Sequence, residues 1–303
     1  MHTYSEEQLT RYFKFLGRPP GPPEQQRDPL SAITLLQVHH MVRVPFESLT
    51  LHYSAHRVLS LDPEDLFKKI VVDGRGGYCM EVNTFFGTVL RSLGLAVVSI
   101  GARGNTNRGY KGWNHMANIV TIDDKKYLVD VGFGSHGPPY PVLLEDGHEF
   151  ACIAPARGRL EYKSLDAHTD PDQRVWVFSS KQNESEPWKE RYAFVTIEFF
   201  PADFEVMNLT TMTARQSYFV QTVMCMRTIL DSERARPEGL LILHKDYVRK
   251  RIGDRSDILE TLKTEEQRVK ALETYFGIVL TPEEQRAIRG LASELGRQVV
   301  ADV

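Results

Sequence analysis

The sequence predicts an α+β fold with a helical N-terminal part, a β-rich middle part and a mixed C-terminal part. Residues 1–95 carry helix start signals and apolar residues at helical spacing. From residue 96 to about 205 the pattern changes to short β-rich runs separated by Gly, Pro, Asp or Asn. Residues 206–303 combine further β-rich runs with two helix signals. We therefore expect a small helical bundle, an antiparallel sheet or barrel, and a third subdomain that contains both helices and strands.

Length and composition are consistent with this division. A chain of 303 residues suits two or three subdomains better than one simple core. Basic and acidic residues are nearly balanced, 37 against 40, so no nucleic-acid partner is expected. We interpret the basic clusters Lys68-Lys69 and Arg249–Arg251 as solvated surface. No apolar run approaches the ~20 residues that span a bilayer, and the N-terminus lacks a signal-peptide pattern, so no membrane partner is expected.

The number and spacing of the cysteines indicate which cellular compartment and which metal sites to expect. Cys79, Cys152 and Cys225 are an odd number and contain no CxxC spacing. This argues against a disulfide framework and a structural zinc site and favours a reducing cytosol. We therefore expect no bound metal and a cytoplasmic location.

Four helices are expected in the N-terminal part. The first three begin at capping or Asp-Pro signals, and the fourth follows the glycine cluster before Cys79. The proline run Pro19–Pro23 should hold the segment after the first helix extended. The expected helix starts are Ser5 with Gln8, Asp28-Pro29 (continuing to Met41), Asp62-Pro63 (continuing to about Val71), and the neighbourhood of Cys79.

The fourth helix is the centre of the functional prediction. After Gly74, Gly76 and Gly77, apolar residues recur at steps of three and four, which indicates one buried helix face. Cys79 falls at the helix start, where unpaired N–H groups, the helix dipole and Arg75 would favour thiolate. The alternative is that Cys79 is a small buried hydrophobe. Partners in space must decide between these two interpretations.

Strands dominate the middle part, and two capped helices close the chain. Cys152 and Cys225 lie in strand patterns and are expected to be inert core residues. The closing helices are expected at Thr264 with Gln267 and at Thr281-Pro282. The expected strands are 95–100, 116–122, 126–131, 149–153, 174–179, 193–199, 218–229 and 240–243.

One predicted hairpin brings a histidine and a carboxylate together. Asp123-Asp124 can form a two-residue turn, and if Ile122 then faces Lys125, Ala117 lies opposite Asp130. His115 would be the diagonal neighbour of Asp130 on one face of the sheet. The pair can act as the base and the orienting group of a cysteine nucleophile. Ordinary polar strand ends are the alternative interpretation.

Several linked motifs resemble those of the arylamine N-acetyltransferase family. Residues 75–83, RGGYCMEVN, are similar to the family's RGGxC-x-E-x-N signature, and residues 129–134, VDVGFG, resemble its VD-x-GFG loop. VPFESL at 44–49 is similar to VPFEN-L, and the terminal FGIVL at 276–280 also fits. The likeness covers nearly the whole chain.

The resemblance implies a fold, a mechanism and a set of site residues. The fold would comprise a helical bundle (1–95), a β-barrel (96–205) and an α/β lid (206–303) around a catalytic core like that of cysteine proteases and transglutaminases. The catalytic triad would be Cys79, His115 and Asp130. No cofactor would be bound, and acyl-coenzyme A would be the cosubstrate, passing its acyl group through a cysteine thioester to an arylamine or arylhydrazine. Such activity would belong to xenobiotic metabolism.

The resemblance also implies contacts in the pocket. Phe133 would contact the acceptor ring, and Gly134 and Ser135 would lie near the coenzyme. Phe46 and Phe219 would complete an apolar wall, with core packing as an equal alternative. Ser217 is a further candidate for a coenzyme contact. The chain departs from the family pattern at Met80, Ser48 and Asn118, which could reshape the pocket.

The same residues allow other interpretations. Gly132–Gly137 matches GxGxxG, but Pro138-Pro139 follows, so no helix can begin there to receive a pyrophosphate. A cysteine hydrolase or transglutaminase-like enzyme could use the same triad, although His115 follows Cys79 much sooner than the ~130–150 residues of the papain type. A non-catalytic protein is disfavoured because no triad member is replaced. The donor could be acetyl-, propionyl- or malonyl-coenzyme A, and a malonyl group would need a cation such as Arg103, Arg108 or Lys111.

Overall fold

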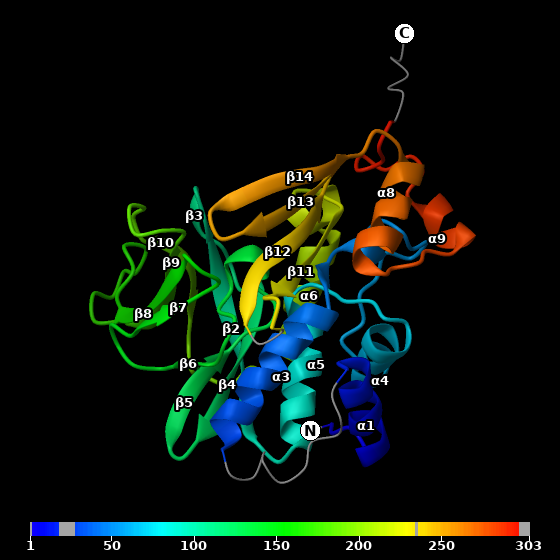
Figure 1. Ribbon diagram of the computed structural model, residues 1–303. Coiled ribbons are helices and arrows are strands. Elements are labelled where there is room, and N and C mark those ends of the chain that lie inside the picture. The colour runs from blue at the N-terminus through cyan, green and yellow to red at the C-terminus, as the bar shows by residue number, and fades with distance from the viewer. Residues whose placement is uncertain (1, 18–27, 234–235, 297–303) are drawn as a thin grey trace.

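The computed structural model describes residues 2–17, 28–233 and 236–296 and confirms the α+β fold (Figure 1). The Pro19–Pro23 run lies outside these residues. The N-terminal part contains α1 (Glu6–Phe15), α3 (Pro29–Arg43), α4 (Pro63–Phe67) and α5 (Cys79–Ser92). The predicted caps are present, because Ser5 and Gln8 form a capping box and Asp28 and Asp62 accept from the first-turn N–H groups. A short π-helix, Lys68–Val72, extends α4 to the predicted end.

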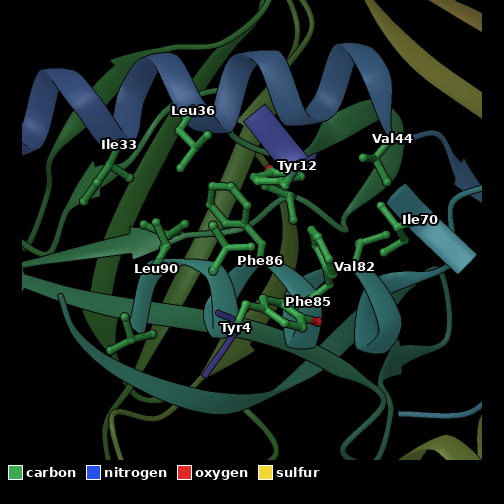
Figure 2. Close-up of a cluster of buried hydrophobic side chains, with 14 of the residues drawn as sticks. Tyr4, Tyr12, Ile33, Leu36, Val44, Ile70, Val82, Phe85, Phe86 and Leu90 are labelled. Carbon is green, nitrogen blue, oxygen red and sulfur yellow. The ribbon is translucent and has the colours of Figure 1, made fainter. Parts of the chain in front are cut away.

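The buried face of α5 organises the core of this part. Phe85, Phe86, Val89 and Leu90 are fully buried and lie at the predicted helical spacing. Figure 2 shows α3 and Tyr12 of α1 packed over the same face. This packing fixes the helix that begins at Cys79.

The middle part forms one antiparallel sheet of nine strands, which covers α5 on its other side. Most predicted strands are present with shifted ends, but 193–199 is wrong beyond Phe194, because the chain bonds there to Ser99 and then turns into a helix. The sheet order is β6-β5-β4-β2-β10-β9-β8-β7, with β3 paired to β2. The strands are β2 (Ala96–Thr106), β3 (Gly109–Tyr110), β4 (His115–Ile122), β5 (Lys125–Val129), β6 (Val142–Leu143), β7 (Glu149–Ala151), β8 (Arg157–Lys163), β9 (Val175–Lys181) and β10 (Lys189–Phe194).

A second sheet of five strands has the order β1-β11-β12-β13-β14. Its first strand, β1 (Phe46–Glu47), comes from the helical part and pairs with β11 through Phe46–Met226 and Glu47–Cys225. The other strands are β11 (Met224–Leu230), β12 (Pro237–His244), β13 (Tyr247–Ile252) and β14 (Arg255–Thr261). The sheet therefore joins segments that are far apart in the sequence.

Helices α6 (Pro201–Thr213) and α7 (Tyr218–Gln221) connect the two sheets, and α8 (Glu265–Ala271) and α9 (Pro282–Ala287) follow the second. The predicted caps Thr264 and Thr281 are confirmed. A strand over 218–229 is wrong at its start, because a helical turn closes where the Gln221 N–H donates to the Ser217 carbonyl at 3.1 Å. Among the described residues, no helix is both long and apolar enough to cross a membrane.

Candidate active site

A cavity of about 360 Å³ lies where the start of α5, the first sheet and the second sheet meet. Seven of the predicted site residues line it: Phe46, Cys79, His115, Phe133, Gly134, Ser135 and Phe219. Asp130 lies behind His115 rather than in the wall. Ser217 is not among the lining residues, whereas its neighbour Tyr218 is.

Glycines shape the loop that presents Cys79. Gly74 has a φ of +65°, a left-handed conformation. A Cβ on Gly76 would lie 1.7 Å from the Pro45 carbonyl oxygen, so only glycine allows this close approach. The loop is also tied to β1, since the Glu47 N–H donates to the Gly77 carbonyl at 3.0 Å. Cys79 is consequently held as the first residue of α5, with its sulfur 3.8 Å from the Asn114 carbonyl.

A buried charge network supports this loop from beneath. The Lys69 ammonium contacts Glu81 at 2.6 Å and Glu47 at 3.9 Å, and the Glu81 carboxylate accepts from the Tyr78 N–H. Arg75 pairs with Glu47 at 3.8 Å and with Glu284 at 2.9 Å. Burial would raise the pKa of Glu47, but Lys69 and Arg75 hold it below its ordinary value. The network therefore keeps a buried carboxylate ionised beneath the loop.

This arrangement corrects two predictions. Arg75 was expected to act on the thiol, but its guanidinium is committed to Glu47 and Glu284. Lys69 was expected in a solvated cluster, but only 19% of its side chain is exposed. Arg251, from the other basic cluster, donates to Gln182 and to the Ser135 carbonyl. Buried carboxylates and carbonyls cannot be recognised from sequence spacing, which explains these errors.

The predicted hairpin has the predicted register. Ile122 pairs with Lys125 and Asn118 with Val129, and both turn residues, Asp123 and Asp124, have positive φ values. His115 and Asp130 lie just beyond this ladder, and His115 Nε2 is 2.7 Å from Asp130 Oδ2. The carboxylate therefore engages one ring nitrogen and leaves Nδ1 for a second partner.

The pair is electrostatically polarised. Burial would lower the pKa of His115, but the charge and the hydrogen bond of Asp130, together with Cys79, raise it to about 10. Burial would raise the pKa of Asp130, but His115, the Asn83 amide at 3.0 Å and the Gly132 N–H at 2.8 Å hold it low. A thiol beside an imidazole that a carboxylate orients can serve as a nucleophile with its own proton relay.

Aromatic rings form the walls around this pair. The Phe133 ring centroid lies 4.9 Å from that of His115 in an edge contact and 4.7 Å from that of Tyr192. Phe46 and Phe219 make an edge contact at 5.9 Å, and both also pack against buried apolar clusters. Each of these two residues therefore lines the cavity and also packs into the core.

Some residues of the site were missed or had an unexpected role. Asn83 donates to Asp130 and to the Met116 carbonyl and accepts from the Val131 N–H, so it joins α5 to the hairpin. It stood in the recognised RGGxC-x-E-x-N motif, which was the available signal. Tyr192, which belongs to β10, packs on His115 with the two ring centroids 4.9 Å apart. No local sequence pattern pointed to Tyr192.

The three departures from the family pattern do not line the described cavity. Met80 is buried in a cluster with Tyr78 and Met116. The Ser48 hydroxyl donates to the Thr222 carbonyl at 2.8 Å, and Asn118 bonds to Ser99 and to the Asn83 carbonyl. Any effect on the pocket must therefore be indirect.

The structure also places the GxGxxG segment, the other two cysteines and the basic residues Arg103 and Lys111. Gly132–Gly137 leads into a short 3-10 turn at Gly134–His136 and not into an α-helix, as expected. Burial raises the pKa of the Cys225 thiol well above its ordinary value and that of Cys152 to about 12. Cys152 is only half-buried and follows β7 rather than lying in it. Arg103 and Lys111 line a separate cavity, where Arg103 stacks on Trp113 at 4.0 Å.

Known proteins resemble this chain over nearly its full length. A family model described as N-acetyltransferase matches residues 29–285. N-malonyltransferase FDB2 of Fusarium pseudograminearum (strain CS3096) is 40% identical over 279 residues, which cover 86% of this chain and 80% of the relative. Arylamine N-acetyltransferase 2 of Mesocricetus auratus is 28% identical, over 90% and 94% of the two chains.

Solved structures agree with the sequence matches. The arylamine N-acetyltransferase of Mycobacterium marinum in complex with CoA superposes with a TM-score of 0.76 at 25% identity and covers 92% of this chain and 98% of that one. The enzyme from Salmonella typhimurium gives 0.80 at 22% identity, over 95% and 98%, which supports the fold. The matching family model, the curated relatives and the shared fold lead to one conclusion: the chain belongs to the arylamine N-acetyltransferase family and is an acyltransferase.

Proposed function

We propose that this protein transfers an acyl group from acyl-coenzyme A to an arylamine or arylhydrazine through a thioester on Cys79. The observation that carries the proposal is the buried hydrogen bond between His115 Nε2 and Asp130 at 2.7 Å. His115 and Cys79 both line the same cavity. Cys79 is the nucleophile, His115 moves protons, and Asp130 orients His115 and stabilises its cationic form.

The reaction has two half-reactions that share this machinery. In the first, the Cys79 sulfur bonds to the acyl carbon, the coenzyme leaves as its thiol, and His115 supplies the proton that the leaving sulfur takes. In the second, the amine nitrogen bonds to the acyl carbon, its proton passes to His115, and the Cys79 sulfur leaves. Backbone N–H groups at the start of α5, including that of Cys79, stabilise the oxyanion of each intermediate.

The proposed donor is malonyl-coenzyme A, with acetyl- and propionyl-coenzyme A as the alternatives. The support is the similarity to the N-malonyltransferase relative at 40% identity. Among the described residues that line the cavity, none is a lysine or an arginine, so besides His115 a malonyl carboxylate would bind neutral donors such as Asn105 and Thr106. Arg103 and Lys111, which were considered for this role, belong to the wall of another cavity.

Position in the cavity supports further proposed roles. We propose that Phe133 contacts the acceptor ring, that Phe46 and Phe219 form the opposite apolar wall, and that Gly134 and Ser135 lie along the coenzyme. Ser217 is proposed as a further coenzyme contact, supported by its position beside the lining residue Tyr218. We also propose a cytoplasmic location, a role in the metabolism of xenobiotic amines, and the three subdomains 1–95, 96–205 and 206–303.

Intact-mass analysis tests the proposal and separates it from a cysteine hydrolase. Incubation with malonyl- or acetyl-coenzyme A without amine should leave one acyl adduct on Cys79, and addition of an arylamine should discharge it. Cys79→Ala should form no adduct, whereas the matched control Cys152→Ala should form it as the wild type does. Parallel double-reciprocal lines are expected for the full reaction. Peptide cleavage without acyl transfer would favour the hydrolase.

A further inference from the structure

A second and larger cavity, of about 710 Å³, lies outside the site described above. Its walls come from one face of α5, one face of α6, the segment 59–63 and the segment 198–201. It shares no lining residue with the cavity that contains Cys79. A volume in this range is typical of sites for small organic ligands.

Most of the wall is apolar. Leu59, Leu61, Phe199 and Phe204 contribute buried or half-buried surface, and Leu209 of α6 is 55% exposed. Phe200, which also lines the cavity, is 64% exposed. Large apolar side chains exposed around a concave surface are typical of a ligand site rather than of an ordinary helix face.

Arg91 lies in this wall, and its position is fixed; the other basic side chain of the described wall, His2, contacts Glu64 at 3.0 Å. Arg91 Nη2 donates to the Ser99 hydroxyl at 2.6 Å, and that hydroxyl donates to Asn118 at 2.9 Å. Asn118 replaces an apolar residue of the family pattern, so this polar chain accompanies a departure from that pattern. Arg91 Nε is buried and has no hydrogen-bond partner among the described residues. The buried Nε is closed to a ligand, but the described residues use only one N–H of the two terminal nitrogens, on Nη2, so the other terminal donors remain unused.

Charge around the cavity is asymmetric. The acidic residues of the wall, Asp62, Glu198 and Glu205, are exposed, whereas Arg91 is half-buried. Burial lowers the pKa of Arg91, and the charge of Glu198 opposes this shift through space. Charges exposed to water are strongly screened, so the half-buried guanidinium is the stronger determinant for a ligand that reaches it.

We propose that this cavity binds an amphipathic monocarboxylic acid, with its carboxylate on Arg91 and its aliphatic or aromatic body along the wall formed by Leu59, Phe204 and Leu209. A carboxylate matches the planar guanidinium and would use its free donors. The apolar body would cover side chains that are otherwise exposed to water. The proposal does not depend on the donor or the acceptor of the transfer reaction.

The cavity also adjoins the catalytic elements. Met116, next to His115 in β4, lines it, and so does Asn208, which is bonded to the Tyr78 hydroxyl beside Cys79. An occupant would therefore contact Met116, which adjoins His115, and Asn208, which is hydrogen-bonded to Tyr78, the neighbour of Cys79.

Calorimetric titration of the full-length protein with dodecanoate tests the proposal. We expect saturable binding at one site, at least tenfold weaker binding to Arg91→Met, and no loss with the exposed control Arg255→Met. Dodecanamide, which lacks the charge, should bind the wild type and Arg91→Met equally. Dodecylammonium binding as tight as dodecanoate binding would overturn the assignment of the carboxylate to Arg91.

Location is tested separately. A photoreactive analogue of dodecanoate should crosslink to α6 or to residues 59–63, and Leu209→Trp, which fills the cavity from an exposed position, should abolish both binding and crosslinking. Crosslinks confined to the Phe133 and Phe219 peptides would mean that the acid binds in the Cys79 cavity, and they would overturn the proposal. Absence of saturable dodecanoate binding to the wild type would also overturn it.

Discussion

Two buried histidines pack near α5, and they differ in their hydrogen-bond partners and in the direction in which the protein shifts their pKa values. His40 of α3 stacks on Phe85, makes a tilted ring contact with Phe86 and shares a hydrogen bond with the Tyr12 hydroxyl at 2.9 Å. Burial lowers its pKa to about 3. His115 lies by the first residue of the helix, and despite burial Asp130 and Cys79 raise its pKa to about 10.

The difference shows that burial alone makes a histidine neutral and a carboxylate makes it a cation. Within the part of the chain that the structure describes, the hydrogen-bond partner of His40 is a hydroxyl, so its charged form is desolvated without compensation. His115 has a carboxylate that is itself held by Asn83 and Gly132. One histidine is thus part of the core, and the other is prepared to move protons.

Removing the carboxylate's charge should have the largest effect. Asp130→Asn keeps a group of the same size but unsettles the tautomer of His115, and we expect a loss in rate of ~10⁴, as in a serine triad with the same change. Asp124→Asn, at the far end of the same hairpin, is the matched control and should retain activity, since asparagine tolerates its φ of 61°. Turnover within tenfold of the wild type for Asp130→Asn would refute the assigned role.

Removing the Asn83 side chain, which donates a hydrogen bond to Asp130, should have the next largest effect. Asn83→Ala leaves Asp130 with one fewer donor and strands the Met116 carbonyl and the Val131 N–H. We expect a loss of about 3 kcal/mol in the free energy of unfolding, with a fall in rate, measured by urea denaturation and steady-state kinetics. Asn107→Ala, at an exposed turn, should leave both unchanged.

The pH dependence of stability should separate the two histidines. The pKa of His40 is lowered on folding, so its contribution is present above pH 6.5 and is lost as pH falls towards 3, by about 2 kcal/mol at pH 5. The pKa of His115 is raised, so its contribution is present below pH 6.5 and is lost as pH rises towards 10.

Two variants sharpen this test. His40→Leu should flatten the acid limb in part, because His52 and His136, with pKa values lowered to about 4, also contribute there. The exposed control His56→Leu should leave that limb as it is in the wild type. Asp130→Asn should flatten the alkaline limb instead. Denaturant midpoints between pH 4 and 10 would measure both, and identical profiles for all variants would contradict the comparison.

The smallest effect concerns the ring beside His115. Phe133→Ala should raise KM for bulky arylamines by the equivalent of about 0.5–1.5 kcal/mol while thioester formation is spared. Phe150, which packs into the same apolar cluster but does not line the Cys79 cavity, provides the matched control Phe150→Ala. Equal losses for small and bulky amines would assign Phe133 to the core.

The sequence was most informative where local chemistry determines geometry. Asp123-Asp124 determined the hairpin register, and with it the approach of His115 to Asp130, because side chains alternate strictly along a strand. Helix caps such as Thr264 were predicted for the same reason. The fold class followed from the change in apolar period.

Features that depend on distant segments could not be derived in this way. The commitment of Arg75 to Glu284 joins residues from opposite ends of the chain, and Tyr192 reaches His115 from a strand with no distinctive pattern. Helix α6 lies between the expected strands 193–199 and 218–229 and was not predicted, although Pro201 lies at its start and Asp203 accepts from the Phe200 N–H. Such contacts are set by how the elements pack together.

The pairing of β1 with β11 has a consequence for recombination between relatives. The segment that begins the second sheet, Phe46–Glu47, is encoded well before the rest of that sheet and also holds the loop that presents Cys79. A chimera that exchanges only the C-terminal region would place a foreign β11 against the resident β1. Breakpoints that move Phe46–Glu47 together with that region should therefore yield folded hybrids more often than breakpoints that separate the two.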